Sequence, residues 1–177
     1  MRREVRICGT GGQGIILAGV ILGETAMRAG YRAVQTQSYG PESRGGAARS
    51  EVLISDQPID YPRVTRADVL VALSQPAYDR YARGLADCAV VVVDGDLVEA
   101  PAARRLPFTT TAEKVARKIV TNIVMLGYLG RLLDLFPHAL LEATVMANIP
   151  PGTEELNRAA LLAGRDLHET MEARHGG

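Results

Sequence analysis

The feature that most constrains the fold is a glycine-rich turn near the start of the chain, between a strand-like run and a helix-like run. Residues 5–8 are mostly apolar, as in a buried parallel strand, and a helical apolar pattern begins at Ile15. Between them stand four glycines: Gly9, Gly11, Gly12 and Gly14. A helix that starts after such a turn points unpaired N–H groups and its positive dipole end at the turn. The order predicts a strand, a turn and a helix, with an anion such as phosphate bound at the turn.

Three of the four glycines have the G-x-G-x-x-G spacing of a dinucleotide-binding turn. Ile15 and Ile16 stand where a P-loop has Lys and Ser or Thr, so a nucleotide triphosphatase is disfavoured. Residues 31–37, the expected second strand, have no carboxylate for the ribose of NAD. We expect phosphate or cofactor contacts from one short segment: Gly9, Gly11, Gly12, Gln13 and Gly14. The alternative is that the glycines only make a tight turn and close helix–strand packing.

Composition narrows the class of protein. The chain has 177 residues, of which 47% are hydrophobic and 23% charged, which is typical of one globular domain over residues 1–177. Its 20 basic and 20 acidic residues balance, which disfavours a nucleic-acid binder. No apolar run approaches the roughly 18 residues of a membrane span. We therefore expect neither nucleic acid nor membrane among its partners.

The cysteines and histidines indicate no metal site. Cys8 and Cys88 lie in apolar runs without a C-x-x-C motif or a signal peptide, so we expect both to be reduced and buried in a cytoplasmic protein. The three histidines have no metal or triad spacing. Asp94 and Asp96 flank a glycine after a strongly β-like run, where they could hold a metal or form an ordinary turn.

Periodicity predicts the remaining elements. Strands are expected at residues 31–36, 49–55, 67–73, 88–94 and 106–110. Helices are expected at residues 15–29, 76–83, from Thr111, at 119–136, 137–147 and after a Thr153 cap. The first two strands and the helix between them form a βαβ unit. The prediction is a three-layer, Rossmann-like α/β fold: an open, mainly parallel sheet, helices on both faces and a helical C-terminal region.

Two further regions supply candidate ligand residues. Segment 38–47 is polar, turn-rich and too irregular for a helix or strand, and it leaves the sheet at the edge that carries the glycine turn. Its candidates are Ser38, Tyr39, Arg44 and Gly45, and Arg44 suits an anionic ligand or a partner's carboxylate. An ordinary surface loop is the alternative. Asn122, inside an apolar helix face, needs hydrogen-bond partners, so it either caps a nearby loop or reaches a ligand.

Three segments in order carry a family resemblance: Gly9-Thr-Gly-Gly-Gln-Gly14, Ser38-Tyr-Gly-Pro-Glu-Ser-Arg-Gly-Gly46 and Thr121-Asn-Ile-Val-Met-Leu-Gly127. With them the chain resembles the gamma subunit of 2-oxoacid:ferredoxin oxidoreductases, from Val5 to about Ala163. The run with Glu42, Arg44 and residues 50–52 looks closest to the 2-oxoglutarate enzyme, although pyruvate, branched-chain and indolepyruvate relatives share much of it.

The resemblance implies a hetero-oligomer with alpha, beta and ferredoxin-like subunits. Such enzymes decarboxylate a 2-oxoacid on thiamine diphosphate, pass electrons through iron–sulfur clusters to ferredoxin and make an acyl-coenzyme A. Thiamine diphosphate, Mg and the clusters are expected in the partner subunits only. This chain would complete the assembly and contact coenzyme A through the glycine turn, with Arg44 and Asn122 steadying the ligand and no residue making bonds. Single-chain relatives have lysines near this turn, and no such lysines are seen in the present sequence.

Two other functions stay open at this point. One is a purely architectural subunit whose glycine turn packs against a partner. The other is a stand-alone dinucleotide-binding protein, which saturable NAD binding would reveal. A homodimer is a further state that the isolated chain can adopt.

Overall fold

A computed structural model describes residues 1–40 and 46–175. The strands are β1 (Arg2–Thr10), β2 (Arg32–Tyr39), β3 (Ala47–Ser55), β4 (Ala67–Ala72), β5 (Leu85–Asp94) and β6 (Arg104–Leu106). The helices are α1 (Ile15–Arg28), α2 (Gln75–Tyr81), α3 (Phe108–Val115), the 3-10 turn η1 (Lys118–Val120), α4 (Thr121–Leu133), α5 (His138–Asn148) and α6 (Glu154–His175).

The strands form one open sheet in the order β2-β3-β1-β4-β5-β6. The pairs β1–β4, β4–β5 and β5–β6 are parallel, whereas β3 runs antiparallel to both β1 and β2. The predicted open and mainly parallel sheet is therefore confirmed. The expected βαβ unit differs in one respect: β3 returns from β2 and lies between β2 and β1.

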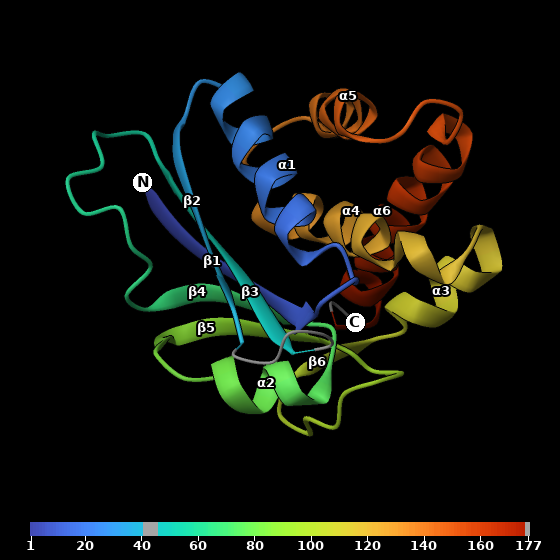
Figure 1. Ribbon diagram of the computed structural model, residues 1–177, viewed down its shortest axis with the longest axis horizontal. Coiled ribbons are helices and arrows are strands. Elements are labelled where there is room, and N and C mark those ends of the chain that lie inside the picture. Colours follow the sequence, from blue (N-terminus) through green and yellow to red (C-terminus); the bar gives the residue numbers. More distant parts are fainter. Residues whose placement is uncertain (41–45, 176–177) are drawn as a thin grey trace.

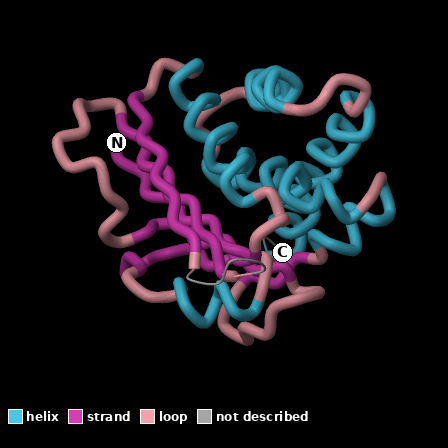
Figure 2. The backbone as a smooth tube through the Cα atoms, in the orientation of Figure 1, coloured by secondary structure: helices cyan, strands magenta, loops and turns pink. Residues whose placement is uncertain are grey.

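Helices cover both faces of this sheet, so the predicted three layers are present (Figure 1). Helix α1 packs on β1, β2 and β3, and the C-terminal helices α4, α5 and α6 gather beside it, whereas α2 lies on the opposite face. Figure 2 shows the strands as a single twisted layer between the two sets. Alternate residues of each strand point to opposite faces. Val5 and Ile7 accordingly join the large core under α1 and α4, and Cys8 joins the smaller core under α2.

Helices α4 and α6 pack backbone to backbone at Gly127. A Cβ at Gly127 of α4 would collide with the backbone of α6 at Leu161, and a Cβ at Gly164 of α6 would collide with the backbone of α4 at Val124. The two helices therefore cross in direct main-chain contact. Gly130 instead faces the side chains of Leu141 and Phe136.

Three local predictions need correction. The strand predicted at 106–110 ends at Leu106, and α3 begins at Phe108 rather than at Thr111. The reason is that Asp96 accepts a hydrogen bond from the Thr110 amide (2.7 Å) and so satisfies the start of the helix. Segment 38–47 is less irregular than predicted at its ends, because residues 38–39 continue β2 and Ala47 opens β3.

Cys88 is exposed rather than buried, while Cys8 is buried as predicted. Strand β5 starts at Leu85, earlier than expected, and its pairing with β4 changes register between Ala67 and Val69. Cys88 falls within this interruption between Leu85 and Val90, and it lines a shallow surface hollow with Arg3 and Leu132.

Candidate ligand site at the glycine turn

The turn between β1 and α1 requires glycine at two positions. Gly12 has a φ of 91° and Gly14 a φ of 69°, which L side chains rarely adopt. Gly14 is also the residue that precedes α1, and it provides no side chain to cap the helix. The carbonyl oxygen of Gly14 accepts the amide of Ala18 (3.0 Å) as the helix begins.

The side chain of Gln13 braces the turn from within. Its Oε1 accepts a hydrogen bond from the Thr10 amide (2.7 Å), and its Nε2 donates to the Leu73 carbonyl at the end of β4 (2.9 Å). Gly9 makes room for this arrangement, since a Cβ there would collide with Gln13 and Ile15. Both polar groups of the Gln13 side chain are thus used inside the chain.

Donors remain open at the mouth of the turn. The Gly11 amide donates to the Gly46 carbonyl (3.1 Å) and the Gln13 amide to the Thr10 carbonyl (3.2 Å). Within residues 1–40 and 46–175, no group accepts a hydrogen bond from the amides of Gly12 and Gly14 or from those of the first three residues of α1. These are the N–H groups that a helix start offers to an anion.

Asn122 closes the turn from the side of α4. The residue is only 5% exposed, and its Nδ2 donates to the Gly14 carbonyl (3.3 Å). It therefore caps the loop, which is the first of the two alternatives that the sequence left open. It also lines a hollow beside Gly12, so contact with a ligand stays a prediction.

Two hollows flank the turn and share Gly12 and Ile119 in their linings. The first, of about 260 Å³, is mostly apolar, with walls from Leu17, Val120, Ile123, Ile149, Pro150 and Leu156. The second, of about 240 Å³, is lined mostly by polar residue types, namely Gln13, Thr109, Lys118 and Thr121, and we call it the polar hollow. Ile119, which lines both hollows, is 77% exposed, an unusual position for an isoleucine.

Lys118 is the residue that sequence reasoning missed. It opens η1, lies exposed on the wall of the polar hollow, and its side chain forms no ion pair or hydrogen bond with any described residue. The expectation that no lysine lies near the glycine turn is therefore wrong. The available signal was that this chain has only two lysines, and that one of them precedes Asn122 by four residues.

Asp94, the last residue of β5, holds Thr109 in the wall of the polar hollow. Its Oδ2 accepts a hydrogen bond from the Thr109 hydroxyl (2.6 Å), and burial raises the pKa of the Asp94 carboxyl. Asp94 and Asp96 both bind the start of α3, so they serve the turn and the helix. Nowhere in the described ranges do three His, Cys, Asp or Glu side chains gather as metal ligands would.

The structure brings some predicted site residues together and separates others. Gly12, Gln13, Gly14 and Asn122 line the two hollows. Ser38 and Tyr39 lie at the end of β2, with β3 between them and β1, and line neither hollow. Arg44 and Gly45 fall outside the residues that the structure describes.

Comparison with known proteins now decides the family. The family model for pyruvate ferredoxin/flavodoxin oxidoreductase matches residues 4–167. The chain belongs to this family.

Relatives within the family match the chain almost end to end. It is 49% identical to the 2-oxoglutarate synthase subunit KorC of Methanocaldococcus jannaschii, over 97% of this chain and 96% of that protein. The KorC subunit of Methanothermobacter marburgensis is 46% identical, over 94% and 97% of the two chains. The family resemblance seen in the sequence is confirmed.

Solved structures of family members share the fold. The gamma subunit of keto/oxoacid ferredoxin oxidoreductase from Geobacter sulfurreducens superposes with a TM-score of 0.85 at 42% identity, over 96% of this chain and 98% of that one. The 2-oxoglutarate:ferredoxin oxidoreductase from Magnetococcus marinus gives a TM-score of 0.86 at 23% identity. The match covers 96% of this chain and 31% of that one, so the fold of the present chain recurs as one part of a longer chain.

The described residues at the turn present groups that can bind a ligand. The site offers backbone donors, one lysine ammonium and an apolar wall. Among the described residues that line the two hollows there is no Ser–His or Cys–His pair and no carboxylate.

No helix over the described ranges is long and apolar enough to cross a membrane.

Proposed function

We propose that this chain is the gamma subunit of a multi-subunit 2-oxoglutarate:ferredoxin oxidoreductase, and that all of residues 1–177 form one gamma-type domain. Family membership and the near full-length likeness to KorC subunits support this assignment. The enzyme would be cytoplasmic and assemble from alpha, beta and ferredoxin-like subunits that hold thiamine diphosphate, Mg and the iron–sulfur clusters. Ferredoxin would receive the electrons.

Within that enzyme, the glycine turn would bind part of coenzyme A. The observation that carries this proposal is the pair of hollows that meet at Gly12, one basic and one apolar. Coenzyme A has the matching division: phosphate groups at one end and a long, mostly uncharged pantetheine arm that ends in the thiol. Support also comes from the Magnetococcus marinus enzyme, whose structure contains coenzyme A and succinyl-CoA and whose fold includes this one.

Each group at the turn would have a separate task. The Gly12 amide and the ammonium of Lys118 would bind phosphate oxygens, as a helix start and a lysine commonly do. Asn122 would hold the turn in shape through Gly14, and the apolar wall with Ile119 would cover the pantetheine arm. Coenzyme A supplies the thiol that accepts the acyl group, and this chain would only hold it in place.

The test is a lysine series in the reconstituted enzyme. Lys118→Ala should raise the KM for coenzyme A about tenfold, equivalent to about 1.4 kcal/mol, because a charged hydrogen bond to phosphate is lost. Lys118→Arg should recover much of the affinity. The matched control is Lys114→Ala, which removes the second lysine, an exposed residue of α3 that lines neither hollow. The KM for 2-oxoglutarate should stay constant throughout.

An unchanged KM for coenzyme A in a fully assembled Lys118→Ala enzyme would rule out this contact. Lys118 is a cleaner target than Gly12, because any side chain at a φ of 91° also strains the turn itself.

A purely architectural role is favoured by one observation, the exposure of Ile119. An isoleucine that is 77% exposed is typical of a surface that a partner covers. In that case Ile119→Ser should weaken co-purification with the sister subunits and leave the KM for coenzyme A of the residual complex normal. If coenzyme A packs there instead, Ile119→Ser should raise that KM and leave assembly intact.

A further inference from the structure

Another hollow, different in character, lies on the face of the sheet opposite α1. Helix α2 covers that face over β1, β3 and β4. The chain segment 56–66, which joins β3 to β4, forms a loop at the left of Figure 1. Residues 61–65 of this segment, together with β2 and β3, line an open, polar hollow of about 470 Å³, which we call the β2–β3 hollow. Its floor includes Thr36, Gln37, Arg49 and Glu51, and its wall includes Tyr61 and Arg63. It shares no lining residue with the hollows at the glycine turn.

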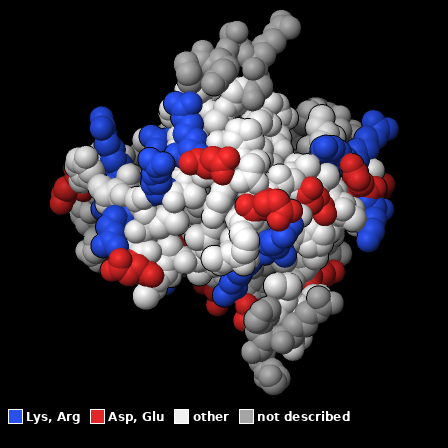
Figure 3. Space-filling model, turned by 90° about the horizontal axis from the view of Figure 1, so that it is seen from below, with Lys and Arg blue, Asp and Glu red and all other residues white. Residues whose placement is uncertain are grey.

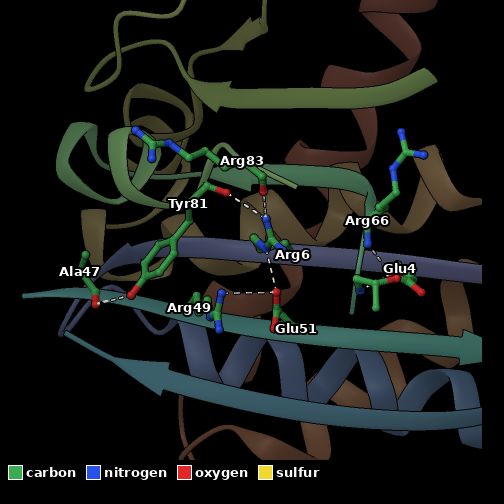
Figure 4. A network of polar contacts seen from close by, with 9 residues as sticks. Glu4, Arg6, Ala47, Arg49, Glu51, Arg66, Tyr81 and Arg83 are labelled. Atoms are coloured by element: carbon green, nitrogen blue, oxygen red, sulfur yellow. Dashed lines mark hydrogen bonds and ion pairs between the residues drawn. The ribbon is translucent and has the colours of Figure 1, made fainter. Parts of the chain in front are cut away.

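The floor of the β2–β3 hollow rests on a buried ion pair. The Nε of Arg6 lies 2.8 Å from Oε1 of Glu51, and both side chains are less than a tenth exposed. Arg6 also donates to the carbonyl oxygens of Tyr81 and Arg83 after α2 (Figure 4). A buried pair with these additional hydrogen bonds is satisfied. The negative charge of Glu51 is therefore already balanced from below by Arg6.

Arg49 then stands over this pair as a second positive charge. Its guanidinium carbon lies 5.2 Å from the centre of the Tyr81 ring, and its Nη1 lies 3.7 Å from Glu51, which is too long for a hydrogen bond (Figure 4). Within the described ranges, the Arg49 guanidinium donates no hydrogen bond. It is held in one place by the ring, while its donors stay available to an incoming acceptor.

The balance of charge around the hollow is positive. Arg6, Arg49 and Arg63 carry three positive charges against the single negative charge of Glu51. Basic and acidic side chains are otherwise interspersed over this face (Figure 3), so the excess is local. The nearby carboxylate of Glu4 is occupied by Arg2 and by the amides of Thr65 and Arg66. The group that complements such a hollow is a carboxylate, which arginine binds through two parallel hydrogen bonds.

The surroundings of the hollow favour a protein segment as the source of that carboxylate. Tyr61 in the wall of the hollow is 54% exposed and adds aromatic surface, and tyrosine and arginine are enriched where proteins bind one another. Strand β2 is the outermost strand, so one of its sides offers unpaired backbone groups to an extended chain. A phosphorylated small molecule fits less well, because the strands of the floor already use the amides between them.

We propose that the β2–β3 hollow is a docking site for an extended, acidic segment of a sister subunit, with an Asp or Glu carboxylate bound between Arg49 and Arg63. This inference rests on the proposed assembly of the chain into a multi-subunit enzyme. If so, the enzyme assembles partly through an electrostatic contact on the face of the sheet away from α1.

The experiment measures assembly of the full-length chain with its sister subunits. Arg63→Glu and Arg49→Gln should each weaken binding about tenfold or more, and the loss should shrink at high salt. The matched control is Arg3→Glu, on the side of the sheet away from the β2–β3 hollow, which should assemble like the wild type. Thermal unfolding of each variant verifies that the chain is folded. A photo-reactive residue at Tyr61, an exposed position in the wall of the hollow, should cross-link to a sister-subunit peptide that contains Asp or Glu.

The outcomes separate the two proposals. If the wild-type chain fails to bind any sister subunit, the proposed function fails and this inference with it. If the wild type assembles, and Arg63→Glu and Arg49→Gln assemble equally well, only the docking site is overturned. Cross-links from Tyr61 to a second copy of this chain would also overturn it.

Discussion

Replacing Gly127 of α4 by alanine should destabilise the protein, although alanine is the better helix former. A Cβ at Gly127 would lie 3.0 Å from the backbone nitrogen of Arg165 and much closer than that to the carbonyl oxygen of Leu161. Both atoms belong to the main chain of α6 and cannot rotate away as a side chain would. Helices α4 and α6 would have to separate by about 1 Å to accommodate the methyl group.

The size of the effect follows from two opposing terms. Overpacking of a tight interface costs about 1–3 kcal/mol, and the better helix propensity of alanine returns up to about 1 kcal/mol. We expect a net loss of about 1–2 kcal/mol in the free energy of unfolding. For a chain of this size, that corresponds to a decrease in Tm of roughly 2–8 °C.

The matched control is Gly23→Ala in α1. A Cβ at Gly23 would lie 3.8 Å from Cγ1 of Val52, an ordinary van der Waals contact. This variant should gain about 0.5–1 kcal/mol from helix propensity alone. Urea and thermal unfolding followed by circular dichroism measure both variants. If Gly127→Ala proves as stable as Gly23→Ala, the argument from direct helix–helix contact is refuted.

Three further predictions concern buried and ionisable groups. Arg6→Met removes the hydrogen-bonded partner of the buried Glu51 carboxylate, leaves only Arg49 at 3.7 Å, and should cost about 3–5 kcal/mol in urea unfolding; a loss below about 1 kcal/mol would contradict the buried pair. Burial raises the pKa of the Cys8 thiol to about 12, so only Cys88 should react with a thiol reagent at neutral pH before the protein unfolds. Rapid labelling of a Cys88→Ser variant would disprove this. Burial lowers the pKa of His168, so the folded state favours the neutral ring, and protonation favours unfolding as the pH falls below about 6.5. Between about pH 7.5 and about pH 5.5 the wild type should lose more stability than His168→Gln, and parallel stability curves would show that the shift is absent.

Local patterns were sufficient to predict most elements of this fold. The order of strand, glycine turn and helix around Gly12 and Gly14 depends on φ angles and on the apolar periods of neighbouring residues, which are properties of a short segment. The contact that Gly127 makes across α4 and α6 could be expected for the same reason, because a glycine inside an apolar helix indicates that another backbone lies close.

The errors arose where non-local contacts override local preference. The insertion of β3 between β1 and β2 is a pairing choice among distant segments that strand propensity does not encode. The early start of α3 depends on Asp96, a residue of another loop that binds the Thr110 amide. Cys88 has an apolar neighbourhood in the sequence but lies where the regular pairing of β5 with β4 is interrupted, and its side chain is exposed.

By itself, the sequence determined the α/β class, the need for glycine at the turn and the family to which the chain belongs, because each depends on residue types at fixed short spacings. Only the tertiary structure decided which distant side chains surround the turn. It placed Lys118 and Ile119 beside Gly12 and set Arg49 over the Arg6–Glu51 pair. Residues about 40 to 110 positions apart come together only after helices and strands have packed, and that packing depends on the whole core rather than on any one segment.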